Sequence, residues 1–184
     1  GRHVFGRPIG QNQGVQFPIA KAYANMRAAE LMVREAIRLY ERVLAEHSEN
    51  EPALRALSEL DESEGRWPEL VEVLATLADV TPNYDEKKEL YQRIGRVQET
   101  HLGNLDAAVA AWNQSLDLDE RDRVVLKELE RLHIARRDWH ALIDIYEKDA
   151  MVDPALEVER RVQIAGIYEQ YIKEKEGKSL PSLT

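Results

Sequence analysis

The chain has 184 residues, of which 43% are apolar and 32% are charged, and its formal net charge is −9. This composition can form a packed core, and the absence of cysteine excludes disulfides, thiolate metal sites and cysteine nucleophiles. An acidic chain repels phosphate backbones, so we expect no nucleic-acid partner. No apolar run reaches the roughly 18 residues that a membrane span needs. We therefore expect no membrane segment and a cytoplasmic location.

Charge is distributed unevenly along the chain. Residues 1–38 carry a net charge of +4, whereas the remaining residues carry −13. Residues 1–15 form a polar, Gly-rich leader. Over residues 16–47 the spacing of apolar residues predicts one long helix, and Pro18 suits its first turn. The apolar stripe of this helix consists of Ile19, Ala22, Met26, Ala29, Val33 and Ala36.

The leader and the start of this helix carry a long motif. It reads Arg2-x-x-Phe5-Gly6-Arg7-Pro8-Ile9, followed by Gln11-Asn12-Gln13 and Phe17-Pro18-Ile19-Ala20. The motif resembles a segment of the C-terminal helical domain of acyl-CoA dehydrogenases, and the resemblance implies that Arg2, Phe5 and Gln13 contact a flavin. The β-domain and the catalytic glutamate context of that family are missing from the sequence. We therefore expect no bound cofactor, and we interpret the segment as a packing helix.

Four stretches farther along the chain align on one large residue. Their anchors are Tyr40, Leu74, Trp112 and Tyr146, which are 34, 38 and 34 residues apart. Each anchor lies in an amphipathic helical stretch. Gly65 and Gly103 precede two of these stretches, and glycine at such a place can take the left-handed conformation that ends a helix. Partner helices are predicted at 52–64, 85–102, 121–136 and 155–175, followed by a tail at 176–184.

This period and these anchors resemble tetratricopeptide repeats (TPRs), which we place at residues 48–175. The matching residues of the third unit are Gly103, Ala108, Trp112 and Ser115. Leu70, Leu74 and Leu142 depart from the consensus. The resemblance implies an all-α, TPR-like solenoid of helical hairpins, here preceded by one long helix, with a concave surface for a partner peptide. One hairpin cannot bury its own apolar face, so the hairpins must stack.

Charged residues at repeated positions are predicted to line the concave side. They are Arg55, Glu59, Arg96, Lys127 and Arg131. A cationic groove could hold the acidic end of a peptide, and the alternative interpretation is that these are ordinary solvated helix charges. Open ends of a repeat array expose apolar surface, so a homodimer is a further hypothesis.

No motif indicates catalysis or metal binding. The sequence lacks a phosphate-binding loop and a Gly-x-Ser-x-Gly nucleophile turn. Glu130-x-x-His133 lacks the second pair that a di-iron site needs. The acidic stretch 117–128 has Asp122 at the place of the glycine that a calcium loop requires. Asp119 or Asp122 is instead predicted to cap the following helix.

The junction between the two resemblances is itself informative. Ala36 to Tyr40 fits the pattern of both families, which favours an artificial, computer-generated or recombinant chimera over a natural fusion, although both stay open. Three hypotheses follow. The favoured one is a non-catalytic helical-repeat scaffold or interaction module, designed without an evolved ligand. The others are a natural adaptor that binds a peptide or protein in a concave groove, and a fragment of a flavin-dependent dehydrogenase-like enzyme.

Overall fold

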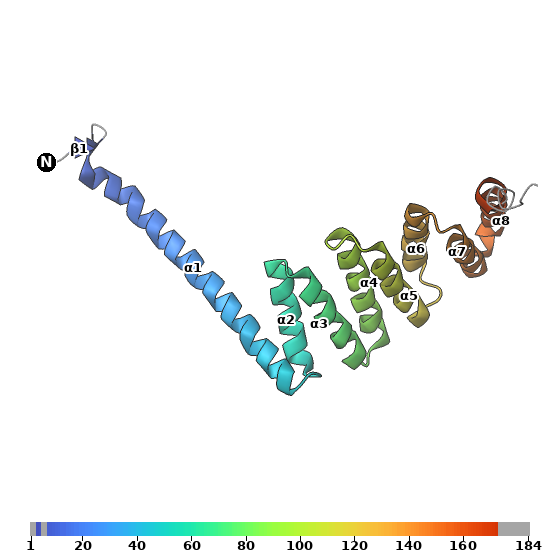
Figure 1. The fold of residues 1–184 in the computed structure, drawn as a ribbon, viewed down its shortest axis with the longest axis horizontal. Helices are drawn as coiled ribbons and strands as arrows, with labels where there is room; N and C mark the ends of the chain where they lie inside the picture. The colour runs from blue at the N-terminus through green and yellow to red at the C-terminus, as the bar shows by residue number, and fades with distance from the viewer. Residues whose placement is uncertain (1–2, 5–6, 173–184) are drawn as a thin grey trace, which may run out of the picture. The chain divides into compact units, whose positions relative to one another are not determined.

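In a computed structural model, the chain is built almost entirely from helices (Figure 1). The structure describes residues 3–4 and 7–172. It divides into two compact units, residues 1–64 and 65–184, and each unit is described by itself. Within the described residues, no helix combines the length and the apolar character that crossing a membrane requires.

Unit 1 is a long helix followed by a short one. Two short strands, β1 (His3–Val4) and β2 (Arg7–Pro8), form an antiparallel pair ahead of them. Helix α1 (Ile9–Glu46) then packs against α2 (Glu51–Glu64). The buried apolar side chains of this unit are Ile37, Ala53, Leu54 and Leu57.

Helix α1 begins earlier than the sequence analysis predicted. Its first residue is Ile9, so residues 9–15 belong to the helix and not to the leader, and Pro18 lies inside it. Gln11 and Gln13 are good helix formers. Proline inside a helix removes one backbone hydrogen bond, but it need not mark the first turn. The predicted start at residue 16 therefore gave too much weight to the glycines and to Pro18.

Unit 2 is an array in which each α-helix packs against the next one along the chain. The helices are α3 (Trp67–Val80), α4 (Tyr84–Thr100), α5 (Leu105–Leu118), α6 (Arg123–Arg136), α7 (Trp139–Val152), η1 (Pro154–Leu156), α8 (Glu157–Ile167) and η2 (Tyr168–Ile172). The prediction of an all-α, TPR-like array of helical hairpins is confirmed. The single helix predicted at 155–175 is wrong, because this stretch is divided into a 3-10 turn, α8 and a π-helical turn.

The helix ends of the array follow the repeat. Gly65 and Gly103 have φ angles of 69° and 63°, as predicted for residues that end a helix in the left-handed conformation. Arg137 takes the same conformation at the same repeat position, with φ 55°. Asp122 caps α6, because its Oδ1 accepts hydrogen bonds from the backbone N–H groups of Val124 and Val125. The prediction that Asp119 or Asp122 caps this helix is thus confirmed.

The centre of the core is the anchor Trp112, which is 1% exposed. Its cluster consists of Ala108, Val109, Trp112, Leu116, Val125, Leu126, Leu129, Leu132 and Ile145 from α5, α6 and α7. The indole also packs directly over Gly95 of α4. A Cβ atom at Gly95 would lie only 2.6 Å from the indole Nε1. The absence of a side chain at Gly95 therefore leaves room for the Trp112 ring between α4 and α5.

We expect the substitution Gly95→Ala to lower the free energy of unfolding by about 1–3 kcal/mol, because the added methyl group must displace the buried Trp112 ring. Gly166→Ala is the matched control, because a Cβ there meets nothing within 4 Å. The control should raise stability by about 0.4–1 kcal/mol by restricting the unfolded chain. Urea unfolding followed by circular dichroism measures both. Equal stability of the two variants would contradict the contact.

Candidate protein-interaction surface

The predicted groove residues are divided between the two units. Arg55 and Glu59 lie on α2 in unit 1, where Arg55 donates a hydrogen bond to Glu51 at 2.6 Å and Glu59 is exposed. Arg96 lies on α4, and Lys127 and Arg131 lie on α6, all in unit 2. The surface of unit 2 can therefore be described by itself.

Arg131 is held in an ion-pair network that joins α4 to α6. Its two terminal nitrogens donate to the two carboxylate oxygens of Glu99, each at 2.6 Å, and Nη2 also donates to Glu128 at 2.8 Å. The hydrogen bonds from Arg131 lower the pKa of Glu99, and the same bonds raise the pKa of Arg131. Two carboxylates thus oppose one guanidinium. Arg131 holds two helices together and supplies no unpaired positive charge.

Arg96 and Lys127 supply the positive charge that remains on this surface. The guanidinium carbon of Arg96 lies 5.7 Å from the centroid of the Trp112 ring, and Nη2 donates to Gln92 Oε1 at 3.2 Å. Lys127 is exposed on α6. Within residues 17–171, neither Arg96 nor Lys127 forms an ion pair. Arg96 is positioned by an aromatic ring and an amide, which leave its charge uncompensated.

Apolar side chains lie at both ends of the same row on α6. Val124 and Ile134 are exposed, and the spacing of Val124, Lys127, Arg131 and Ile134 places all four on one side of the helix. We call Arg96 together with these four residues the α4–α6 surface. It combines two uncompensated cations with two exposed aliphatic side chains on a framework fixed by the Arg131–Glu99 pair.

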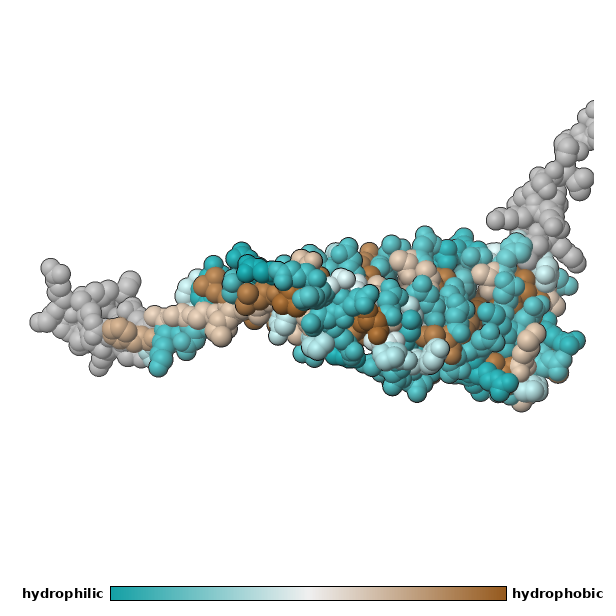
Figure 2. Space-filling view, turned by 90° about the horizontal axis from the view of Figure 1, so that it is seen from below, coloured by the Kyte–Doolittle hydropathy of each residue, from teal (hydrophilic) through white to brown (hydrophobic). Residues whose placement is uncertain are grey.

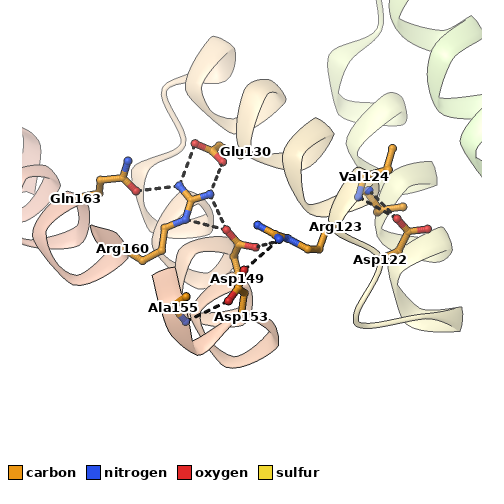
Figure 3. Close-up of polar contacts among 10 residues, drawn as sticks. Asp122, Arg123, Val124, Glu130, Asp149, Asp153, Ala155, Arg160 and Gln163 are labelled. Carbon is orange, nitrogen blue, oxygen red and sulfur yellow. Dashed lines mark hydrogen bonds and ion pairs between the residues drawn. The ribbon is translucent and has the colours of Figure 1, made fainter. Parts of the chain in front are cut away.

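A second cluster of charges lies beside this surface, where α6, α7 and α8 meet (Figure 3). Arg160 donates to Asp149 Oδ2 through Nε and Nη2, at 2.8 and 2.6 Å. Its terminal nitrogens also donate to Glu130 at 3.0 and 3.3 Å, and Nη1 donates to Gln163 at 2.8 Å. Arg160 is 8% exposed and Asp149 is 4% exposed. The cluster is thus a buried ion-pair network that connects three helices.

The network also fixes the state of Tyr146. The hydroxyl of Tyr146 donates to Glu130 Oε1 at 3.2 Å, and burial together with the charge of Glu130 raises the pKa of this hydroxyl to about 12. Burial alone would lower the pKa of Arg160, but the bonds to Asp149 and Glu130 outweigh it, so this pKa is raised. The tyrosine is therefore neutral and the arginine charged at any physiological pH. We interpret the network as structural.

The sequence analysis missed this network, although a signal was present. Asp149 follows its anchor Tyr146 by three residues, as Ser115 follows Trp112, and Arg160 occupies the repeat position that Leu126 occupies one unit earlier. A buried acid and a buried base thus replace a serine and a leucine. The sequence signal for this network is therefore a pair of charged residues at positions where the preceding repeat has a small and an apolar residue.

A hollow of about 670 Å³ lies next to Arg160, between α7 and α8. Its lining residues are Glu147, Ala150, Met151, Pro154, Glu157, Arg160, Arg161 and Ile164. Arg161 is paired with Glu157 at 2.6 Å, so the exposed charge around the hollow is partly compensated. In the part of the chain with described side chains, no three His, Asp or Glu residues are placed to share a metal ion.

Comparison with known proteins finds two unrelated likenesses. Residues 1–55 match the family model of the acyl-CoA dehydrogenase C-terminal domain, and residues 125–158 match that of the tetratricopeptide repeat. The chain joins two kinds of sequence. The dehydrogenase-like match extends through the junction predicted near residue 38 and into α2. No curated protein matches the chain in sequence.

Several solved structures have a similar course of the chain. MamA is 19% identical, with a TM-score of 0.47 over 93% of this chain and 99% of MamA. PilF of Pseudomonas aeruginosa is 18% identical, with a TM-score of 0.45 over 76% of this chain and 72% of PilF. YrrB, a TPR protein with an unusual peptide-binding site, is 14% identical, with a TM-score of 0.46 over 86% of this chain and 90% of YrrB.

Two of the three residues implied to contact a flavin, Arg2 and Phe5, lie outside the described residues. Gln13 belongs to α1, but its side chain is also outside the described part. The predicted flavin contacts thus stay a prediction.

Replacing the buried network by its repeat equivalents provides a test of its role. Arg160→Leu alone should lower the free energy of unfolding by about 3–5 kcal/mol, because Glu130 loses its cation and Asp149 keeps only the 3.9 Å contact with Arg123. The double variant Arg160→Leu/Asp149→Ser restores the residues found one repeat earlier, and it should recover the part of this loss that comes from Asp149. Urea unfolding measures each. Strictly additive losses would show that the two residues do not act as a pair.

His133 gives the fold a pH dependence that can be measured. It is 5% exposed on α6, its Nδ1 lies 3.9 Å from Asp138 Oδ2, and burial, assisted by Arg136, lowers its pKa against the opposing effect of Asp138 and Asp144. The unfolded chain therefore binds the proton more readily. The free energy of unfolding should fall as the pH drops below about 6.5.

Thermal unfolding of the wild type and of His133→Gln between about pH 8 and pH 5 isolates this group. The wild type should lose more stability over this range than the variant does. Parallel curves for the two proteins would show that His133 does not titrate with folding.

Proposed function

We propose that unit 2 is a non-catalytic interaction module whose α4–α6 surface binds a peptide or protein segment that carries carboxylates. The observation that carries this proposal is the pair of uncompensated cations, Arg96 and Lys127, beside exposed Val124 and Ile134. Cations pair with the carboxylates of a ligand, and the aliphatic side chains offer apolar contact area.

The framework under this surface supports the proposal. Arg96 is held by Trp112 and Gln92, and the bidentate contact of Arg131 with Glu99 fixes α4 against α6. Side chains that are positioned in advance lose less conformational entropy on binding. Arg131 acts in this proposal as a positioning residue. Reversing its charge would also separate the two helices, so Arg131 is a poor residue with which to test binding itself.

Selection of short random-sequence peptides against the full chain tests the proposal. Enriched peptides should be acidic, and their affinity should fall as salt is added. Lys127→Glu should weaken the binding of these peptides by roughly tenfold or more, because it places a carboxylate of the protein next to the carboxylates of the peptide. Lys148→Glu, an equal charge change at an exposed position on α7, should leave it unchanged. Equal affinity of both variants, or selection that yields no binder, would overturn the proposal.

The other hypotheses stay distinct from this one. A designed scaffold without an evolved ligand predicts that the selection fails. The flavin-dependent alternative depends on Arg2, Phe5 and Gln13, and it is supported only by the likeness of residues 1–55 to the dehydrogenase domain. We favour the interaction module because its surface is built from described residues in unit 2.

A further inference from the structure

Helix α1 exposes an unusual amount of apolar surface. Six large side chains between residues 17 and 32 are from 53% to 73% exposed: Phe17, Ile19, Tyr23, Met26, Leu31 and Met32. Figure 2 shows these hydrophobic side chains gathered along α1, toward the left of the view. Exposed apolar patches of this extent mark interaction sites.

One apolar row of α1 continues a surface that is already buried. Ile19, Met26 and Val33 are seven residues apart, and Ile37 follows Val33 by four, so all four lie on one side of the helix. Ile37 is 6% exposed in the part of α1 that precedes α2. By the helical rise, α1 is about 57 Å long and α2 about 21 Å. Helix α2 is therefore too short to cover the row, which continues toward Ile19.

The uncovered row on one copy of α1 can pack against the same row on an antiparallel second copy. Two antiparallel copies of α1 that cross at Met26 would place Ile19 opposite Val33, so that a large side chain meets a smaller one. A twofold interface requires this kind of self-complementarity.

The charges on α1 agree with this register. In the crossing at Met26, Lys21 lies opposite Leu31, Arg27 opposite Asn25 and Arg34 opposite Pro18. Lys21 lies on the far side of α1 from the row, whereas Arg27 is one residue from the crossing point, so the two copies of Arg27 lie on the same edge of the interface. Arg27 is in addition paired with Glu30 of its own helix at 2.5 Å. The Glu30 carboxylate of each copy therefore lies beside these guanidinium groups and offsets their mutual repulsion.

We propose that the chain forms a homodimer through residues 17–33 of α1, paired antiparallel about Met26. The occupant of the exposed row is the α1 helix of a second copy, which supplies the same length of uncovered apolar surface. This interface belongs to unit 1 and is independent of the α4–α6 surface in unit 2.

Light scattering of the full chain on a sizing column, at about 1–100 µM, tests the proposal. The wild type should have twice the chain mass of 21.2 kDa. Met26→Glu places two carboxylates at the crossing point, and it should raise the dissociation constant of the dimer by at least roughly tenfold. Ala28→Glu adds the same charge on the opposite side of α1 and should leave the dimer intact. A monomeric wild type, or a dimer that withstands Met26→Glu, would overturn the proposal.

Cysteine crosslinking distinguishes the antiparallel arrangement, because the natural chain contains no cysteine. Under mild oxidation by a disulfide such as oxidised glutathione, Met26→Cys should form a covalent dimer. Ile19→Cys alone should not, whereas a mixture of Ile19→Cys and Val33→Cys chains should. Self-crosslinking of Ile19→Cys would indicate a parallel pair, and it would overturn the proposed register.

Discussion

A pair of helices cannot bury the apolar surface that it creates, and the rest of this structure depends on that constraint. In unit 2 each helix is covered by the next one, and the cluster around Trp112 draws its side chains from three helices. The indole of Trp112 packs against Gly95, where the absence of a side chain leaves room for the ring between two helices. A charge buried within the stack is paired inside it, as Arg160 is with Asp149 and Glu130.

Local chemistry made much of the fold predictable from the sequence. The period of about 34 residues located the anchors Trp112 and Tyr146, and both are buried. Gly65 and Gly103 were identified as helix ends because glycine takes the left-handed conformation without strain. Asp122 was identified as one of two candidate caps because its short carboxylate can reach the first backbone N–H groups of the next helix. The helix ends and the cap depend only on residues a few positions apart, and the anchors follow from a repeat that can be read in the sequence itself.

Contacts between distant residues could not be predicted in the same way. Arg131 was predicted to line the concave side, and its pairing with Glu99 in another helix, which the sequence did not indicate, leaves it without the free charge that the prediction assumed. The network around Arg160 depends likewise on Glu130, thirty residues away. Periodicity identifies which positions lie on one side of a helix. It does not identify which opposite charges will meet there.

Helices α1 and α8 differ in the polarity of the residues at positions that no other described helix covers. Glu159, Gln163 and Gly166 of α8 occupy the repeat positions that are held in α6 by Val125, Leu129 and Leu132, which are fully buried. These three positions of α8 are therefore more polar than their equivalents in α6. On α1, Ile19, Met26 and Val33 extend a buried row, and burying them releases water from apolar surface. Association through these α8 positions would desolvate a carboxylate and an amide, whereas Ile19 and Met26 of α1 offer exposed apolar side chains, so we expect pairing through unit 1.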